Sequence, residues 1–255
     1  MPSEKPFDLV IVDLDGTIIH PYEASEISPR VIETVAAVQA MGVPVTIATG
    51  RTLEYVRAHL GGLRVTLPIV TAQGAIIGDP VTGQVLDEID LPLDAARRLT
   101  AWIDEVNPVS ALYFSNRDGT IRVVQNRTGD RRDFELYALG TPSILQPRLA
   151  GLLAAADAHS PIKIMLLNDP AVEPDHAPAL KAAFTPELTL TRTHPILIEA
   201  TAPGVDKGEG VRKLCARLGV DPARVLAICD SDNDIPMLEA EGFPIAMGNA
   251  TPGVL

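Results

Sequence analysis

The stretch VIVDLDGTII, residues 10–19, is the part of the sequence that decides the fold. Its first residues form a short apolar run, which is typical of a strand buried on both faces of a parallel sheet. Two carboxylates, Asp13 and Asp15, follow where that strand should end, and Gly16 then allows a sharp turn. Side chains two residues apart on extended backbone point the same way, so both carboxylates can face one reacting centre.

Outward from this strand, the sequence predicts a βαβ unit. A helix begins after Ser28 with proline at its first position, and strands follow over residues 43–48 and near 68–71. Parallel sheets of this kind bind ligands at the carboxyl ends of their strands. The polar residues expected at the end of the second strand are Thr49, Gly50 and Arg51.

The pattern changes from about residue 82 to about residue 196. This block predicts a helix over 93–106, strands over 111–115 and 120–124 around a turn, an Ala-rich helix over 149–158 and a strand over 162–167. It contains no obvious acidic constellation. We therefore expect an inserted α+β domain over 82–196, and an α/β core with a doubly wound parallel sheet formed by residues 1–81 and 197–255.

The chain then returns to its first pattern. Asp206 and Glu209 form a capping-box signal for a helix, which places Lys207 in the first turn. The helix dipole disfavours a cation there by about 0.3–1 kcal/mol, so an anion held at the helix start would explain this lysine. A buried strand over 225–229 next delivers the acidic run DSDND, residues 230–234, at its carboxyl end.

These residue types predict chemistry on a phosphate ester. Two close carboxylates repel each other, which raises one pKa and allows one to attack while the other carries a proton. Attack on an anion also needs positive charge, which Lys207 and a divalent cation held by Asp230 and its neighbours can supply. Mg²⁺ suits this site because it takes one or two protein carboxylates together with water and substrate phosphate.

Composition excludes several classes of partner. The formal net charge of −12 argues against nucleic acid, whose phosphates are bound by surplus Lys and Arg. No apolar run approaches the roughly 18 residues that a membrane span needs, and no targeting segment is evident, so we expect a cytoplasmic protein. Cys215 and Cys229 predict reduced, packed thiols. Nothing in the sequence indicates an oligomeric state.

Four motifs in order resemble those of the haloacid dehalogenase-like (HAD) phosphatases. They are DLDGT at 13–17, TGR at 49–51, the Lys207–Gly208 pair, and DSDND followed by IPML. The chain is most similar to the Cof-type subfamily with a type IIB cap, because the insert falls where that cap lies and AMGNA at 246–250 is similar to the closing motif. The resemblance implies a Rossmann-like core with an inserted C2B cap domain that selects the substrate.

The resemblance also implies catalytic roles. Asp13 would be the nucleophile that forms an aspartyl-phosphate, and Asp15 the acid that protonates the leaving alcohol and then activates water. Thr49 and Lys207 would hold the phosphoryl oxygens, with Gly50 beside them. Arg51 either reaches the substrate phosphate or forms a surface salt bridge.

The implied Mg²⁺ ligands are Asp13, the backbone carbonyl of Asp15, and Asp230, with Asn233 and Asp234 supporting them. Two positions depart from the subfamily pattern: Gln73 replaces the usual asparagine after the third strand, and Cys229 replaces a glycine before Asp230. A longer amide at 73 would place any substrate contact differently.

Other interpretations remain open at this point. A lone Asp-x-Asp-Gly is more often a turn than an active site. Residues 230–241 imitate a calcium loop, but Ile235 stands where that loop needs glycine. The favoured function is a Mg²⁺-dependent phosphatase for a small phosphorylated metabolite, such as a sugar phosphate. The alternatives are a phosphometabolite-binding or regulatory protein without turnover, and a phosphomutase.

Overall fold

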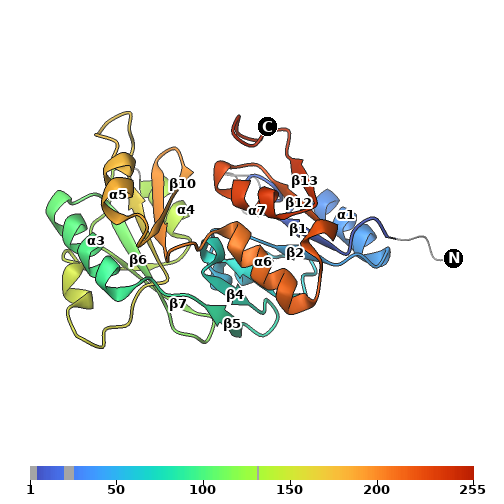
Figure 1. Ribbon diagram of the computed structural model, residues 1–255, viewed down its shortest axis with the longest axis horizontal. Helices are drawn as coiled ribbons and strands as arrows, with labels where there is room; N and C mark the ends of the chain where they lie inside the picture. Colours follow the sequence, from blue (N-terminus) through green and yellow to red (C-terminus); the bar gives the residue numbers. More distant parts are fainter. Residues whose placement is uncertain (1–4, 20–25, 131) are drawn as a thin grey trace. The chain divides into compact units, whose positions relative to one another are not determined.

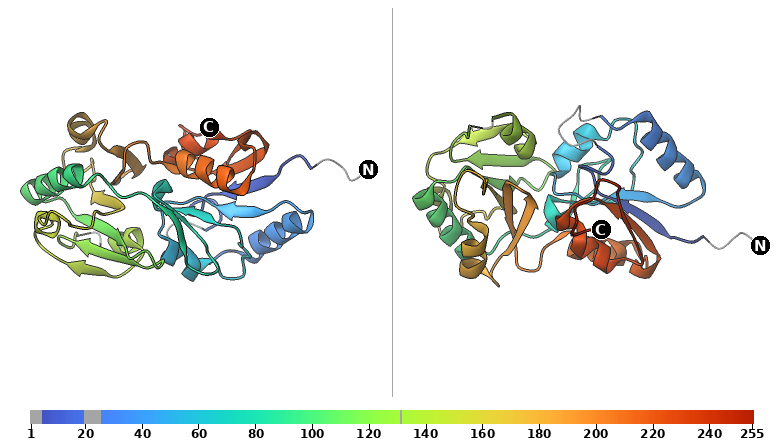
Figure 2. Two further views of the ribbon diagram at one scale, coloured as in Figure 1. Left: turned by 60° about the horizontal axis from the view of Figure 1, so that its bottom comes forward. Right: turned by 90° about the horizontal axis from the view of Figure 1, so that it is seen from above.

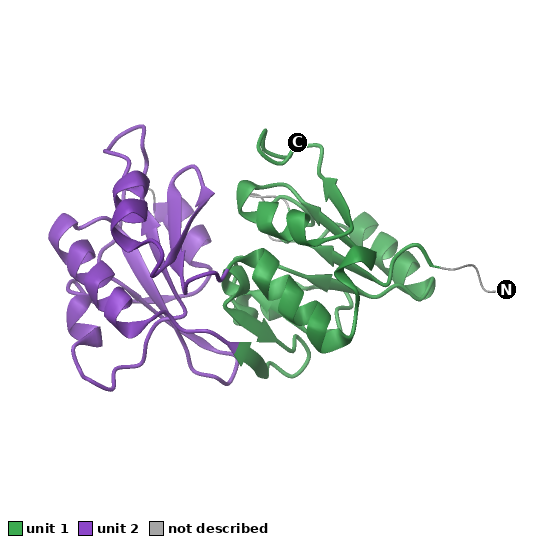
Figure 3. Cartoon of the chain, viewed as in Figure 1, with its two compact units in different colours: residues 1–87, 206–255 green, residues 88–205 purple. Residues whose placement is uncertain are grey.

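The computed structural model of the chain describes residues 5–19, 26–130 and 132–255. It forms two compact units (Figures 1 and 3): Met1–Asp87 with Asp206–Leu255, and Glu88–Val205. The sequence predicted an insert over 82–196. In the structure both boundaries lie further along the chain. The strand β5 (Val85–Glu88) forms its backbone hydrogen bonds in a sheet of the first unit, and β11 (Leu197–Thr201) forms its own in the sheet of the second unit.

The first unit is built on a parallel sheet with the strand order β13-β12-β1-β2. Its strands are β1 (Leu9–Val12), β2 (Val45–Ile47), β12 (Val225–Cys229) and β13 (Phe243–Ala246). Val12 in β1 pairs with Ile47 on one side and Ile228 on the other. The residues that follow β1, β2 and β12 therefore meet at one edge of the sheet.

Helices lie on both faces of this sheet (Figure 1): α1 (Pro29–Ala40), α2 (Leu53–His59), α6 (Lys207–Leu218) and α7 (Ile235–Ala240). Successive residues of β1 point to opposite faces. Val10 and Val12 pack in one hydrophobic cluster with α1 and α2, whereas Leu9 and Ile11 pack in another with α6 and α7. The doubly wound α/β core predicted from the sequence is confirmed.

A short second sheet in this unit consists of β3 (Ile69–Thr71), β4 (Ile76–Gly78) and β5. A parallel bridge between Ala48 and Val70 connects it to the end of β2. The 3-10 turn η1 (Ala72–Gly74) joins β3 to β4 and holds Gln73 in a left-handed conformation, with φ of 59°. The Gln73 side chain is therefore presented beside the carboxyl end of β2.

The second unit contains a six-stranded, mainly antiparallel sheet with the order β10-β11-β9-β6-β7-β8. The remaining strands are β6 (Ser110–Ser115), β7 (Ile121–Gln125), β8 (Ser143–Leu145), β9 (Lys163–Leu167) and β10 (Thr189–His194). Its helices are α3 (Leu93–Val106), α4 (Arg132–Leu139) and α5 (Ala177–Phe184). Leu99 of α3 and Leu180 of α5 share one core with Leu112 and Ile164 of the sheet, so both helices cover the same face (Figure 2).

The Ala-rich helix predicted over 149–158 is wrong. The structure has only a 3-10 turn, η2 (Ala150–Leu153), at this place. Arg97 donates to the carbonyls of Leu153 and Ala155, at 2.8 and 2.7 Å, and so occupies acceptors that a longer helix would use. Residues 154–158 also lack a large apolar side chain to bury, and alanine propensity alone does not stabilise so short a helix.

Two further expectations concern the interior and the membrane. Cys215 and Cys229 are buried free thiols, as the sequence predicted. Within the described ranges, no helix combines the length and the hydrophobicity needed to cross a bilayer.

Candidate active site

Polar side chains gather where β1, β2 and β12 end. Asp13 follows β1, and its backbone N–H donates to Ile228 O in β12 at 2.9 Å. Thr49 follows β2, and its N–H donates to Val70 O at 2.9 Å. Asp230 follows β12 directly. The ladder between adjacent parallel strands thus brings together residues that lie far apart in the sequence.

Lys207 lies at the centre of this group. It is the first residue of α6, whose start is capped by the Asp206 side chain accepting from Glu209 N at 2.8 Å. The buried Lys207 Nζ donates to Asp13 Oδ1 at 2.5 Å and also to Asp234 Oδ1. These two carboxylates are the anions that stabilise a lysine in the first turn of this helix.

Burial and charge act in opposite directions on this pair. Burial alone would lower the pKa of Lys207, but Asp13 and Asp234 raise it above its ordinary value. Burial raises the pKa of Asp13, and Lys207 opposes that rise while Asp234 adds to it. Lys207 is therefore a permanent cation, and an ionised Asp13 depends on positive charge beside it.

The carboxylates Asp13, Asp230 and Asp234 form a group that could hold a metal ion. Each offers an oxygen, and these atoms lie within 4.8 Å of one another. Burial raises the pKa of Asp230, with Asp234 as the next cause. Three buried carboxylates face one lysine, and hard oxygen ligands with surplus negative charge suit a divalent cation such as Mg²⁺. The donor set therefore fits the predicted ion.

Asp230 is held from two sides. Thr17 Oγ1 donates to Asp230 Oδ1 at 3.2 Å, and Asn249 Nδ2 donates to Asp230 Oδ2 at 3.3 Å. Asn249 Nδ2 also donates to Gly16 O at 3.0 Å. Gly16 has φ of +83°, and a Cβ there would lie 2.1 Å from Asp230 Oδ2, so only glycine permits this approach.

Asp15 and Arg51 form a separate pair at the same edge of the sheet. Arg51 Nε donates to Asp15 Oδ2 at 2.9 Å and Nη2 donates to Oδ1 at 2.8 Å. The backbone N–H of Arg51 donates to Thr49 Oγ1 at 3.1 Å. Of the two roles predicted for Arg51, the structure shows a salt bridge, but to the predicted acid and with the arginine buried rather than on the surface.

Gln73 links the loop after β3 to the acidic run. Asn233 Nδ2 donates to Gln73 Oε1 at 3.3 Å. A Cβ on Gly50 would lie 2.2 Å from Gln73 Nε2, so the glycine of the TGR motif makes room for this longer amide. The substitution that departs from the family pattern is thus accommodated locally. Asn233 and Gly50, both predicted site residues, are brought to the same side chain.

Two side chains at this site had no role assigned from the sequence, and for a third, Gln73, the sequence predicted only that a substrate contact would be displaced. Thr17 and Asn249 hold Asp230, and Gln73 bonds Asn233. Each belongs to a stretch that the sequence had singled out, but spacing alone does not reveal their partners. Thr17 lies within DLDGT, and Asn249 within AMGNA at 246–250.

A second metal-capable group among the described residues lies in the second unit. It contains Glu88, Asp90 and His159, with ligand atoms within 4.8 Å. Arg117 Nε is 3.3 Å from Glu88 Oε1, and its Nη2 is 3.8 Å from Asp90 Oδ2. None of these three residues belongs to the four motifs, so the group at Asp13 is the one that matches the predicted metal site.

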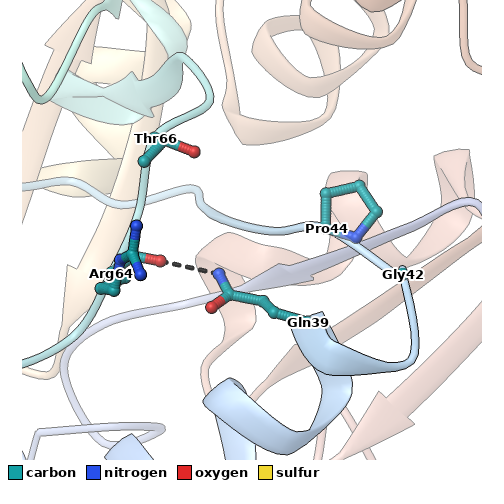
Figure 4. Close-up of a pocket in the computed structure, with 5 residues that line it drawn as sticks. All are labelled: Gln39, Gly42, Pro44, Arg64 and Thr66. Atoms are coloured by element: carbon teal, nitrogen blue, oxygen red, sulfur yellow. Dashed lines mark hydrogen bonds between the residues drawn. The ribbon is translucent and has the colours of Figure 1, made fainter.

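The first unit also has a surface pocket (Figure 4). Its lining residues are Gln39, Gly42, Pro44, Arg64 and Thr66. Gln39 Nε2 donates across it to Arg64 O at 2.7 Å. Pro44 directly precedes β2, so the pocket lies at the amino end of that strand, and its lining has no carboxylate. It is not a candidate for the predicted chemistry.

Comparison with known proteins agrees with the motifs. The family described as haloacid dehalogenase-like hydrolase matches residues 10–255. YxeH of Bacillus subtilis (strain 168), which is provisionally named as a phosphatase, is 28% identical over 258 residues. That alignment covers 98% of this chain and 90% of YxeH.

Solved structures show the same fold. A haloacid dehalogenase-like hydrolase from B. subtilis superposes with a TM-score of 0.82 at 21% identity, covering 97% of this chain and 91% of the other. BT4131, a sugar phosphatase of HAD subclass IIB, gives a TM-score of 0.76 at 20% identity, covering 97% and 90%. The chain belongs to the haloacid dehalogenase-like hydrolase family.

Proposed function

We propose that this protein is a Mg²⁺-dependent phosphomonoester hydrolase for small phosphorylated metabolites, with sugar phosphates as the substrate class. The observation that carries the proposal is the placement of Asp13 at the end of β1, bonded to Lys207 and grouped with Asp230 and Asp234. Family membership supports the reaction, and the fold shared with a sugar phosphatase supports the substrate class.

In the first half of the proposed reaction, a carboxylate oxygen of Asp13 attacks the phosphorus, and the bond from phosphorus to the ester oxygen breaks. Asp15, in its protonated form, gives its proton to that oxygen, so the alcohol leaves neutral. Lys207 and Thr49 donate to the phosphoryl oxygens, and Gly50 lets the backbone approach them. The product is an aspartyl-phosphate on Asp13.

In the second half, water attacks the phosphorus of the aspartyl-phosphate, and the bond to Asp13 breaks. Asp15 now accepts a proton from the attacking water. Inorganic phosphate leaves, and both aspartates return to their starting states. One residue thus serves first as acid and then as base.

Asp13, the backbone carbonyl of Asp15, and Asp230 would hold Mg²⁺, with Asn233 and Asp234 behind them. When bound, the ion supplies the positive charge that lets a carboxylate approach a phosphate. We assign the choice of substrate to the inserted unit, Glu88–Val205, in its proposed role as a cap domain.

Phosphate release from a panel of phosphorylated sugars and small metabolites tests this proposal. Wild-type protein should release phosphate with Mg²⁺ and not with EDTA, and Asp13→Asn should lose release by at least about 1,000-fold while remaining folded. Binding of a panel member without turnover would instead indicate a regulatory protein. Transfer of the phosphoryl group to a sugar hydroxyl would indicate a phosphomutase.

A further inference from the structure

The pair between Arg51 and Asp15 has a geometry that fixes the orientation of the carboxylate. Two hydrogen bonds, of 2.9 and 2.8 Å, join Nε and Nη2 of the arginine to the two oxygens of the aspartate. The arginine side chain is 10% exposed and that of Asp15 is 27% exposed. A bidentate arginine pair restrains the plane of the carboxylate as well as its position.

Arg51 is itself restrained from several directions. Its guanidinium carbon lies 4.5 Å from the centre of the Tyr55 ring, and Tyr55 stacks on His59 with centroids 3.9 Å apart. Its backbone N–H donates to Thr49 Oγ1, and its carbonyl accepts from Ala72 N at 2.8 Å. An arginine held at both its backbone and its side chain is not a solvated surface residue.

We propose that Arg51 is a positioning residue for Asp15, whose planar guanidinium, supported by Tyr55, sets the direction in which the carboxylate faces the leaving oxygen. The side edge of the guanidinium, formed by Nε and Nη2, is the edge that binds Asp15. A carboxylic acid that is free to rotate would place its proton-bearing oxygen at the leaving group only part of the time. This inference rests on the proposed phosphatase function.

The choice of leaving group distinguishes a residue that positions the acid from a residue that binds phosphate. The constant kcat/KM covers the steps up to departure of the alcohol, and a p-nitrophenolate leaves without a proton whereas a sugar alkoxide does not. Loss of a residue that positions the acid should therefore reduce kcat/KM for the sugar ester alone. Loss of a residue that binds phosphate should reduce kcat/KM for both esters equally.

The experiment measures kcat and KM on p-nitrophenyl phosphate and on the sugar phosphate that wild type hydrolyses fastest. Arg51→Met should lower kcat/KM for the sugar phosphate by about 10- to 100-fold and for the aryl ester by less than about threefold. Asp15→Asn should show the same preference for the aryl ester, more strongly. Arg51→Lys keeps the positive charge but lacks the planar guanidinium that forms two hydrogen bonds. It should therefore show most of the loss of kcat/KM on the sugar phosphate.

Arg57→Lys serves as the matched control, because Arg57 lies on α2, the helix that carries Tyr55, and donates to Pro80 O at 3.1 Å. Its kcat/KM values should stay at wild-type level. Equal losses on both esters for Arg51→Met, or full rescue by Arg51→Lys, would overturn the proposal while leaving the phosphatase function intact. Absence of release from both esters by wild type would overturn the proposed function itself.

Discussion

Two buried lysines, one in each unit, make the same contact in different surroundings. Lys207 Nζ lies 2.5 Å from Asp13 Oδ1, and Lys163 Nζ lies 2.5 Å from Glu199 Oε1. Lys207 stands among three carboxylates. Glu199, in contrast, belongs to neither acidic group that the described residues form.

The difference between these lysines is one of charge balance. A buried pair of one cation and one anion compensates its own charge and is roughly neutral for stability overall. Three carboxylates around one lysine are not compensated, which is a cost that a bound cation and a reaction can explain. We therefore interpret Lys163 and Glu199 as a structural pair and Lys207 as part of the active site.

The largest expected effect is on phosphatase activity, which should depend on Lys207 and not on Lys163. Lys207→Met should lower kcat/KM for phosphate release by about 1,000-fold, because it removes a donor to the phosphoryl group and to Asp13. Lys163→Met should lower it by less than about tenfold. Steady-state assays on one sugar phosphate provide both values. A similar loss in both variants would make Lys163 a functional residue and remove the distinction.

The next effect is on Mg²⁺ binding by the three carboxylates around Lys207. Mg²⁺ should raise the Tm of the wild-type protein, and Asp230→Asn should weaken Mg²⁺ affinity by at least about 10- to 100-fold. Titration calorimetry measures this affinity without any substrate. Glu199→Gln is the control in the other unit and should bind Mg²⁺ as wild type does. Unchanged affinity in Asp230→Asn would place the ion elsewhere.

Stability provides the third test. Lys163→Met alone should lower the free energy of unfolding by about 3–5 kcal/mol, because it removes the cation that bonds the buried Glu199 carboxylate. The double variant Lys163→Met/Glu199→Leu should recover most of that loss. Denaturant unfolding gives each value. If the double variant is as unstable as the single one, Lys163 and Glu199 do not form a self-compensating pair.

A buried carboxyl with no hydrogen bond provides the smallest effect. Neither side-chain oxygen of Glu241 has a hydrogen-bond partner in the described chain, and burial raises its pKa to about 7, with Arg212 opposing. The folded state therefore favours the protonated form. This contribution is complete below about pH 4.5, the ordinary value, and is lost as the pH rises through 7.

Glu241→Gln should remove this pH dependence, since its side chain has no carboxyl to ionise. Its advantage over wild type in the free energy of unfolding should be on the order of 1–3 kcal/mol larger at pH 8 than at pH 4.5. Thermal or denaturant unfolding across this range measures it. Parallel pH profiles for the two proteins would show that Glu241 titrates normally.

Much of the first unit could be predicted because its signals are local. The apolar run before Asp13 gives β1, and the caps at Ser28 and Asp206 give the starts of α1 and α6. The helix predicted over 149–158 is wrong because alanine content is a weak local signal. Arg97, which is distant in the sequence, donates to carbonyls of this stretch that a longer helix would have used.

For the candidate site, too, some features follow from the sequence and others only from the tertiary structure. The sequence by itself determined which residue types stand at the ends of β1, β2 and β12, because strand length and turn chemistry are local properties. Only the tertiary structure decided their partners: Lys207 with Asp13, Arg51 with Asp15, Asn249 with Asp230. The physical reason is that hydrogen bonds and ion pairs act over a few ångströms in space, which sequence separation does not measure.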